Sequence, residues 1–202
     1  MTASAGPALK RLFAEVGDRV AFLTVYVREA HPGSRYPQPS TLEEKMAHAR
    51  AYKKRDGIPW MVAVDDIAGT FHRSLDPKPN NTYFVDKDGR IVFRMLWSND
   101  EAGLRRGVNV LLSADPAAHA GERKAQAVPI LRGIGMMDEV LGGPGDSARR
   151  DMRRALPAAY ALARLARAFR PLPPLGRTLG AIAMVALAGT AGAALAWRAG
   201  RG

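Results

Sequence analysis

An uncharged apolar run near the C-terminal end constrains the fold of this chain more than any other feature. The run covers residues 179–197 and contains no Asp, Glu, Lys or Arg. Because a helix rises about 1.5 Å per residue, the run reaches roughly 28 Å, close to the apolar thickness of a bilayer. The sequence therefore predicts a single transmembrane helix over residues 178–198, with Trp197 at the membrane interface. The alternative is a buried alanine-rich helix, because Ala and Gly make the run only modestly hydrophobic.

Basic residues are concentrated directly before this run. Residues 1–112 hold 17 Lys or Arg against 13 Asp or Glu, whereas the remainder holds 13 against 6. Residues 149–177 contain one acid, Asp151, and eight arginines: Arg149, Arg150, Arg153, Arg154, Arg164, Arg167, Arg170 and Arg177. Only Arg198 and Arg201 follow the run. Flanks rich in Lys and Arg stay in the cytoplasm, so we expect a single-pass C-terminal anchor with the globular domain on the cytoplasmic side.

The net charge of +11 allows two kinds of partner. Nucleic-acid surfaces usually carry basic and aromatic residues interleaved on a folded face, and the arginines here cluster beside an apolar helix instead. That arrangement favours anionic lipid headgroups, so we expect a membrane partner and no nucleic acid. Within the apolar run, Ala188, Gly192 and Ala196 recur every four residues. Small residues at this spacing let two membrane helices approach closely, which predicts a homodimer.

Residues 149–177 are predicted to form a basic juxtamembrane amphipathic helix. Between residues 158 and 170, apolar side chains fall on one side of a helix and arginines on the other. Such a helix suits the headgroup plane of a membrane. The alternative is a solvated helix that packs on the globular domain.

The first 112 residues alternate between helical and strand patterns. Helices are predicted at residues 7–17, 40–57, 69–75 and 100–112, with Ser40 and Glu43 as a capping box. Two apolar runs, at 20–27 and 60–64, predict strands buried on both faces, and residues 82–85 and 90–96 flank an Asp-Lys-Asp-Gly hairpin turn. This order predicts an α/β fold, with a thioredoxin-like sheet, flanking helices and a terminal β-hairpin, but with the first strand missing.

The chain is thus divided into a thioredoxin-like domain at 1–112, a linker at 113–148, the basic helix at 149–177 and the transmembrane helix at 178–198. The linker, rich in Ala, Gly and Pro, is expected to hold only one small helix. The chain contains no Cys, which excludes disulfides, thiolate zinc sites and thiol nucleophiles from these residues.

Short motifs in the first half resemble the iodothyronine deiodinase family and its bacterial redoxin relatives. The strand at 20–27 ends in Tyr26 and Val27 and is followed by Glu29, Ala30 and His31, which match the family's Tyr-x-x-Glu-Ala-His pattern. Further similarity covers Pro59-Trp60, Phe71-His72-Arg73 and the hairpin at 83–97. The resemblance extends over roughly residues 7–112.

This resemblance implies a thiol- or selenol-dependent reductase in which Glu29 and His31 are catalytic, moving protons and positioning the substrate. It also implies a thiol reductant as a partner and no cofactor or metal. The chain departs from the family because the nucleophile is absent, and because its predicted anchor is C-terminal instead of N-terminal. One expectation is a true start upstream of Met1, and the alternative is a non-catalytic binding or scaffolding module at the membrane.

Two histidine patterns have simpler explanations. His31 precedes Pro32 at a strand end, so it also fits a surface imidazole at the start of a loop. Glu44 and His48 lie four residues apart on a predicted helix, which could hold a metal, but two ligands without a third usually form a solvated ion pair.

Overall fold

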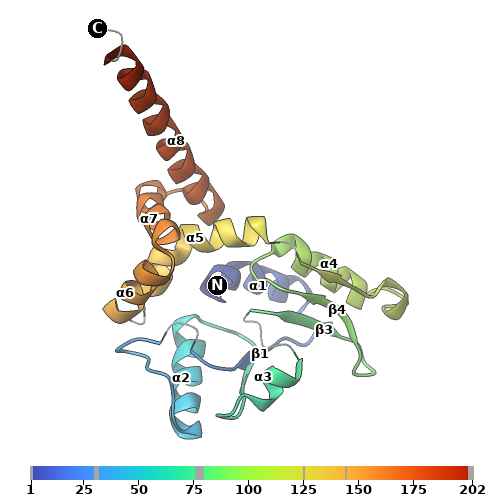
Figure 1. Ribbon diagram of the computed structural model, residues 1–202. Helices are drawn as coiled ribbons and strands as arrows, with labels where there is room; N and C mark the ends of the chain where they lie inside the picture. Colours follow the sequence, from blue (N-terminus) through green and yellow to red (C-terminus); the bar gives the residue numbers. More distant parts are fainter. Residues whose placement is uncertain (1, 30–31, 76–79, 125, 144, 200–202) are drawn as a thin grey trace.

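The computed structural model describes residues 2–29, 32–75, 80–124, 126–143 and 145–199. It is a mixed α/β fold in which a body of helices and small sheets carries one long C-terminal helix that projects away from it (Figure 1). The predicted α/β class is confirmed at this level, as is an apolar C-terminal helix long enough to cross a membrane.

The first sheet has two parallel strands, β1 (Leu23–Tyr26) and β2 (Met61–Val64). Tyr26 lies opposite Val64, and the Trp60 indole donates a hydrogen bond to the Thr24 hydroxyl at 2.9 Å. Helix α2 (Leu42–Arg55) lies between these strands in sequence and contacts β2. Its capping box is Thr41 with Glu44, one residue later than predicted, because the Thr41 hydroxyl is the group that reaches the Glu44 backbone N–H.

Helix α3 (Thr70–Leu75) follows β2 and is fixed by a buried carboxylate. Asp65 is 5% exposed and accepts hydrogen bonds from the backbone N–H groups of Phe71 and His72 at 3.1 and 3.0 Å. A carboxylate at this position satisfies N–H groups that have no partner inside the helix. The short helix predicted at 69–75 is therefore confirmed.

The second sheet contains the predicted hairpin, β3 (Thr82–Val85) and β4 (Ile91–Met95). Asp86 Oδ1 accepts hydrogen bonds from the backbone N–H groups of Asp88 and Arg90, both at 2.9 Å, and Gly89 has a positive φ of 80°. These contacts close the turn. A third strand, β5 (Gly121–Arg123), pairs in parallel with β4 and was not predicted.

Helices α1 (Thr2–Val16) and α4 (Glu101–Leu111) pack together and build the main core with the second sheet. The most deeply buried side chains of this core are Phe93 and Leu104, and Leu12 and Phe84 are buried beside them. A Cβ at Gly107 of α4 would lie 2.3 Å from the Phe84 ring, so only glycine permits this close approach. Helix α1 begins at Thr2 instead of at residue 7, and Pro7 lies inside it.

The same helix α1 also contacts the first sheet. The Phe13 ring lies 5.3 Å from Phe22, at the entry to β1, and 5.4 Å from Trp60, at the entry to β2. Aromatic pairs at these distances bury large apolar areas and favour edge-to-face or tilted arrangements. Helix α1 therefore connects two sheets that share no hydrogen-bonded strand pair among the described residues.

The described strands form two separate sheets, whereas the sequence predicted one thioredoxin-like sheet. Within the described ranges, β1 pairs only with β2, and β3 pairs only with β4, so each leaves one edge without a strand partner. The strand predicted at 20–27 is shorter than expected and not covered on both faces, since Leu23 is 57% exposed and Met61 opposite it is 67% exposed. This end of the sheet therefore keeps one face partly open to solvent.

Residues 113–148, predicted as a linker, are largely ordered into elements. They contain a 3-10 turn η1 (Ala117–His119), strand β5, and helix α5 (Ala127–Gly142). At least one glycine in this segment, Gly135, allows close packing between helices. A Cβ at Gly135 would lie 2.0 Å from the Pro174 carbonyl oxygen, so Gly135 allows the start of the C-terminal helix to lie directly against α5.

Three further helices complete the chain: α6 (Asp146–Ala155), α7 (Pro157–Ala166) and α8 (Pro174–Ala199), with a 3-10 turn η2 (Arg167–Phe169) before α8. The single amphipathic helix predicted for 149–177 is thus several elements. Pro157 begins α7 at its N1 position and separates it from α6. Helices α5, α7 and α8 contact one another and form a small bundle at the base of the projecting helix (Figure 1).

Candidate functional site

A cluster of titratable and aromatic side chains lies where the segment after β1 meets α2. We call it the Glu29 cluster. It comprises Tyr26 and Glu29 from the β1 segment, Tyr36 from the following loop, and His48, Tyr52 and Arg55 from α2. His48, Tyr52 and Arg55 are three or four residues apart, so they share one side of α2.

Glu29 is the centre of this cluster. Its Oε1 accepts a hydrogen bond from the Tyr26 hydroxyl and lies 3.4 Å from His48 Nδ1. Both the Glu29 and His48 side chains are mostly buried, at 20% and 17% exposure. The His48 nitrogen meets no acceptor with hydrogen-bond geometry, so the contact with Glu29 is an ion pair when the imidazole carries a proton.

Aromatic rings and one guanidinium surround this pair. The Tyr26 and Tyr52 rings lie 6.0 Å apart, and the Tyr36 ring meets the His48 ring edge-on at 5.5 Å. The Arg55 guanidinium lies 5.7 Å from the Tyr52 ring and 6.0 Å from the Tyr36 ring. At these distances a guanidinium is attracted to the ring faces. The rings shield Glu29 and His48 from water.

Burial raises the pKa of two side chains in the Glu29 cluster. Burial raises the pKa of the Glu29 carboxyl above its ordinary value, and the His48 imidazole and the Arg55 guanidinium oppose part of that rise. Burial, together with the charge of Asp56, raises the pKa of the Tyr52 phenol to about 12. A carboxyl of raised pKa beside an imidazole is an arrangement that general acid–base catalysis uses. The cluster contains no thiol, because the 202 residues include no Cys.

Of the two predicted catalytic residues, the structure describes only Glu29. Glu29 lies in the cluster, while His31 lies outside the described residues, so its predicted role stays a prediction. The described partner of Glu29 is His48, which the sequence singled out only as a metal candidate with Glu44. Glu44 instead accepts hydrogen bonds from Ser40 and caps α2. Among the described residues, no group of three His, Asp or Glu could hold a metal ion.

A separate groove of about 190 Å³ lies along the second sheet. It is lined by Asn81, Tyr83, Arg94, Met95, Leu96, Glu122, Lys124 and Gln126. Glu122 forms ion pairs with Arg94 at 3.2 Å and with Lys124 at 2.9 Å. The cationic side chains of this groove, Arg94 and Lys124, are therefore already paired with the Glu122 carboxylate.

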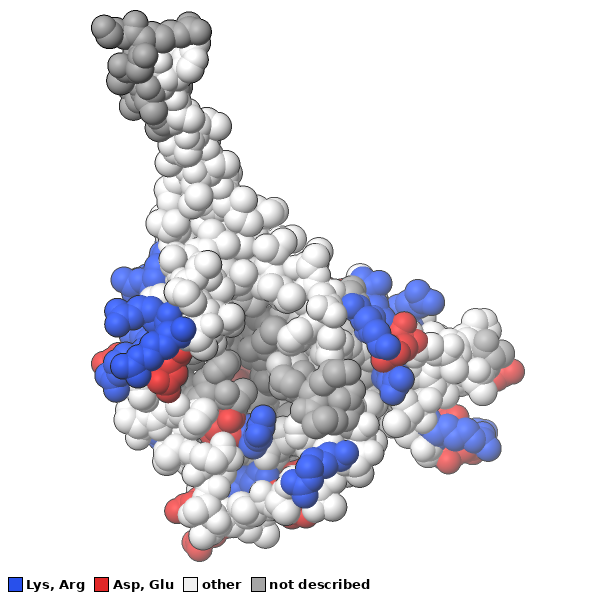
Figure 2. Space-filling view, viewed as in Figure 1, with Lys and Arg blue, Asp and Glu red and all other residues white. Residues whose placement is uncertain are grey.

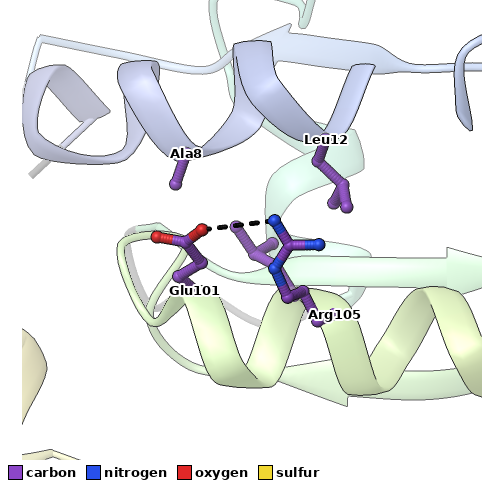
Figure 3. A pocket seen from close by; sticks show the side chains of 5 residues that line it. Ala8, Leu12, Glu101 and Arg105 are labelled. Carbon is purple, nitrogen blue, oxygen red and sulfur yellow. Dashed lines mark ion pairs between the residues drawn. The ribbon is translucent and has the colours of Figure 1, made fainter. Parts of the chain in front are cut away.

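A smaller hollow lies between α1 and α4 (Figure 3). Ala8 and Leu12 face it from α1, and Glu101 and Arg105 form a 3.5 Å ion pair on the α4 side. Arg105 also binds Glu15 of α1 at 2.7 Å. The hollow has no room for a water molecule, so it is a packing seam and no binding site.

The remaining functional feature is α8, which is buried only at its base. The Thr178 hydroxyl donates a hydrogen bond to the Leu131 carbonyl oxygen at 2.7 Å, and Arg177 pairs with Glu139 at 2.8 Å. Thr178 and Ala181 are fully buried. From Ile182 onward, every described side chain of α8 is exposed.

No protein-family model, curated protein or solved structure matches this chain. The resemblance to deiodinases and the roles it implies therefore stay predictions.

The charge of Glu29 should weaken the folded state at neutral pH. Because folding raises its pKa, the stabilising effect of the protonated form is complete below the unfolded pKa and is lost as pH rises through the folded pKa. Glu29→Gln keeps an acceptor for Tyr26 and removes the charge. We expect its melting temperature, relative to the native protein, to rise as pH increases from about 4 to about 7.

Glu43→Gln is the matched control, because Glu43 is exposed on α2, the helix that carries His48, and its replacement also removes one negative charge. Thermal unfolding followed by circular dichroism measures both variants. A relative melting temperature for Glu29→Gln that falls as pH rises would show that the ionised Glu29–His48 pair stabilises the fold, contrary to this account.

Proposed function

We propose that this protein is a membrane-tethered module, held by α8 as a single-pass C-terminal anchor. The observation that carries the proposal is the exposure of apolar side chains along the projecting part of α8. Val185 is 52% exposed, Leu187 70% and Trp197 59%. In water such a surface is unfavourable, whereas in lipid it is the normal exterior of a spanning helix.

The dimensions support this proposal. The exposed part of α8, residues 182–199, rises roughly 27 Å, which nearly matches the apolar thickness of about 30 Å in a bilayer. The base of α8, from Pro174 to Ala181, is instead occupied by contacts with α5, α7 and η2. A buried core helix would be mostly covered, but only 11% of the most apolar window, Pro174–Ala191, is buried.

We further propose that the α/β part lies on the cytoplasmic side. Eight arginines precede the apolar part within residues 149–177, and only Arg198 and Arg201 follow it. The positive-inside rule counts basic residues within about 15–20 residues of a span, and on that count the N-terminal flank stays in the cytoplasm.

For the α/β part we propose a deiodinase-like redoxin domain that has no thiol chemistry of its own. The order of elements, the parallel β1–β2 pair, the antiparallel β3–β4 hairpin and the single helix α1 packed against both sheets support a thioredoxin-type arrangement. Glu29 at the end of β1 supports the family assignment. Since the 202 residues contain no Cys, thiol or selenol chemistry would need a nucleophile from outside them.

The second candidate function is a non-catalytic binding or scaffolding module at the membrane. The open edges of β1 and β3 favour it, because unpaired strand edges can accept an extended segment of another chain. The two candidates differ in what a thiol or selenol supplied from outside these 202 residues would do: the redoxin candidate predicts turnover with it, and the binding module predicts none.

Two arginines placed in the projecting part of α8 should release the protein from membranes. Each arginine at the centre of a span costs about 2.5–3.5 kcal/mol. We expect the double variant Val185→Arg with Leu187→Arg to move from the carbonate-resistant membrane fraction to the supernatant. The matched control is Val85→Arg with Ile91→Arg, at residues that are 47% and 45% exposed on the hairpin.

The control variant should stay in the membrane fraction. If the native protein itself is extracted completely by alkaline carbonate, α8 does not span a membrane and the anchoring proposal is wrong.

The purified chain should show no thiol-dependent peroxidase or dehalogenase turnover, because it carries no group that can form the required thiolate or selenolate. The measurement is reductant consumption with dithiothreitol and a peroxide or an iodinated phenol, compared with heat-inactivated protein. Turnover above that background, lost in Glu29→Gln, would show that the domain is catalytic without a thiol of its own.

A further inference from the structure

The arginines at the base of α8 divide into two groups according to their partners. Arg164 and Arg167 both bind Asp138 of α5, at 3.4 and 3.3 Å, and Arg177 binds Glu139. The Asp138 carboxylate is only 7% exposed. These three arginines therefore hold α7, η2 and α8 against α5, and Asp138 and Glu139 offset most of their charge.

The second group has no such compensation. Arg150, Arg153 and Arg154 of α6 and Arg170 after η2 are exposed, and none forms an ion pair with an acid of the described residues. Unpaired arginines in water need no partner, but four in one region create a local positive field. We call these four residues the free arginines.

Large apolar side chains are exposed in the same region. Leu156 between α6 and α7 is 54% exposed, Leu165 of α7 38%, and Leu172 before α8 45%. Leu179 on α8 is 49% exposed and continues this apolar surface toward the projecting helix. A surface that joins exposed leucines to arginines is typical of segments that lie in the headgroup region of a bilayer.

The position of the basic residues fits the same geometry. Figure 2 shows Lys and Arg side chains gathered beside the foot of α8, where Figure 1 places α6 and α7, while the projecting helix itself is free of charge on this face. Three of the free arginines belong to α6, which contacts α5 and α7, and α7 in turn contacts α8.

We propose that the free arginines and the neighbouring exposed leucines bind the surface of a bilayer that contains anionic phospholipids. The guanidinium groups would pair with lipid phosphates, and the leucine side chains would enter the headgroup boundary. This inference rests on the proposed anchor and names the lipid class that its base contacts. The exposed leucines favour a membrane over nucleic acid, since a phosphate backbone offers them no apolar surface.

Contact between the free arginines and lipid phosphates would fix the orientation of the body on the membrane. If α8 alone held the protein, the body and α8 could tilt together relative to the bilayer. Docking of α6 and α7 on the same leaflet would fix the body at a constant height and orientation. The paired arginines keep the bundle rigid, and the free arginines attach it to the surface.

The absence of cysteine makes a direct test simple, because one introduced thiol is unique. Ala155→Cys lies in the exposed last position of α6, next to Arg154. The full chain carrying an environment-sensitive fluorophore at this site is reconstituted into vesicles of phosphatidylcholine alone or mixed with phosphatidylglycerol. We expect a blue-shifted emission only in the anionic vesicles, and a reversal of the shift in high salt.

The specific variant replaces Arg150, Arg153 and Arg154 with Gln in the labelled background. From the typical contribution of a basic residue at an anionic surface, the ratio of docked to undocked protein should fall by about 100-fold. The matched control replaces Arg28, Arg50 and Arg73, three exposed arginines of the α/β part, and should keep the shift.

The outcomes separate this inference from the anchor. A carbonate-resistant protein whose emission is the same in neutral and anionic vesicles overturns the inference and leaves the anchor standing. A protein that fails to insert overturns both. Equal loss of the shift in the specific and control variants shows unspecific attraction and overturns the inference. The inference is also overturned if the emission is the same in all vesicles and the protein instead binds duplex DNA in a salt-sensitive way that requires Arg150, Arg153 and Arg154.

Discussion

The attachment of α8 to α5 is the interaction on which the rest of this structure depends. Only glycine at position 135 lets the start of α8 lie against α5, and the Thr178 hydroxyl then bonds to the Leu131 carbonyl oxygen. These contacts occupy the first two turns of α8, and the described side chains that follow, from Ile182 onward, are exposed. The helix is therefore rigidly held at one end and apolar and exposed at the other, which is the geometry of an anchor.

The α/β part depends on a different constraint, the division of its strands into two sheets. Helix α1 is the element that joins them, through Phe13 on one side and the main core on the other. The open edge of β1 leaves its strand short. Beyond its end, burial by α2 raises the pKa of Glu29 and places it beside His48. The cluster therefore places a carboxyl of raised pKa beside an imidazole, with no thiol to accompany them.

The sequence was sufficient for features that depend on local patterns. The hairpin around Gly89, the helix 101–111 and the uncharged run follow from turn chemistry and periodicity, and the structure confirms them. Features that depend on tertiary contact were missed. Nothing local to residues 121–123 predicts β5, because that strand exists only by pairing with β4. The Ala, Gly and Pro content of residues 113–148 predicted a linker, because the packing role of a glycine such as Gly135 is visible only against Pro174.

The candidate site shows the same limit. Tyr26 and Glu29 were found from their order along one segment, but His48 comes from another element. A search for spacings of three and four on α2 would have placed His48, Tyr52 and Arg55 on one face. That spacing could not show that Glu29 faces them. The homodimer predicted from Ala188, Gly192 and Ala196 depends on a second copy and stays a prediction.

The central claim is that the projecting part of α8 lies inside a bilayer, and accessibility of a single thiol tests it most directly. Leu187→Cys would be the only thiol in the chain, at a residue that is 70% exposed in the protein alone. In sealed vesicles it should not react with a membrane-impermeant maleimide, and it should react fully after detergent is added. Reaction in intact vesicles as fast as that of Val85→Cys on the hairpin would place Leu187 in water and contradict the account.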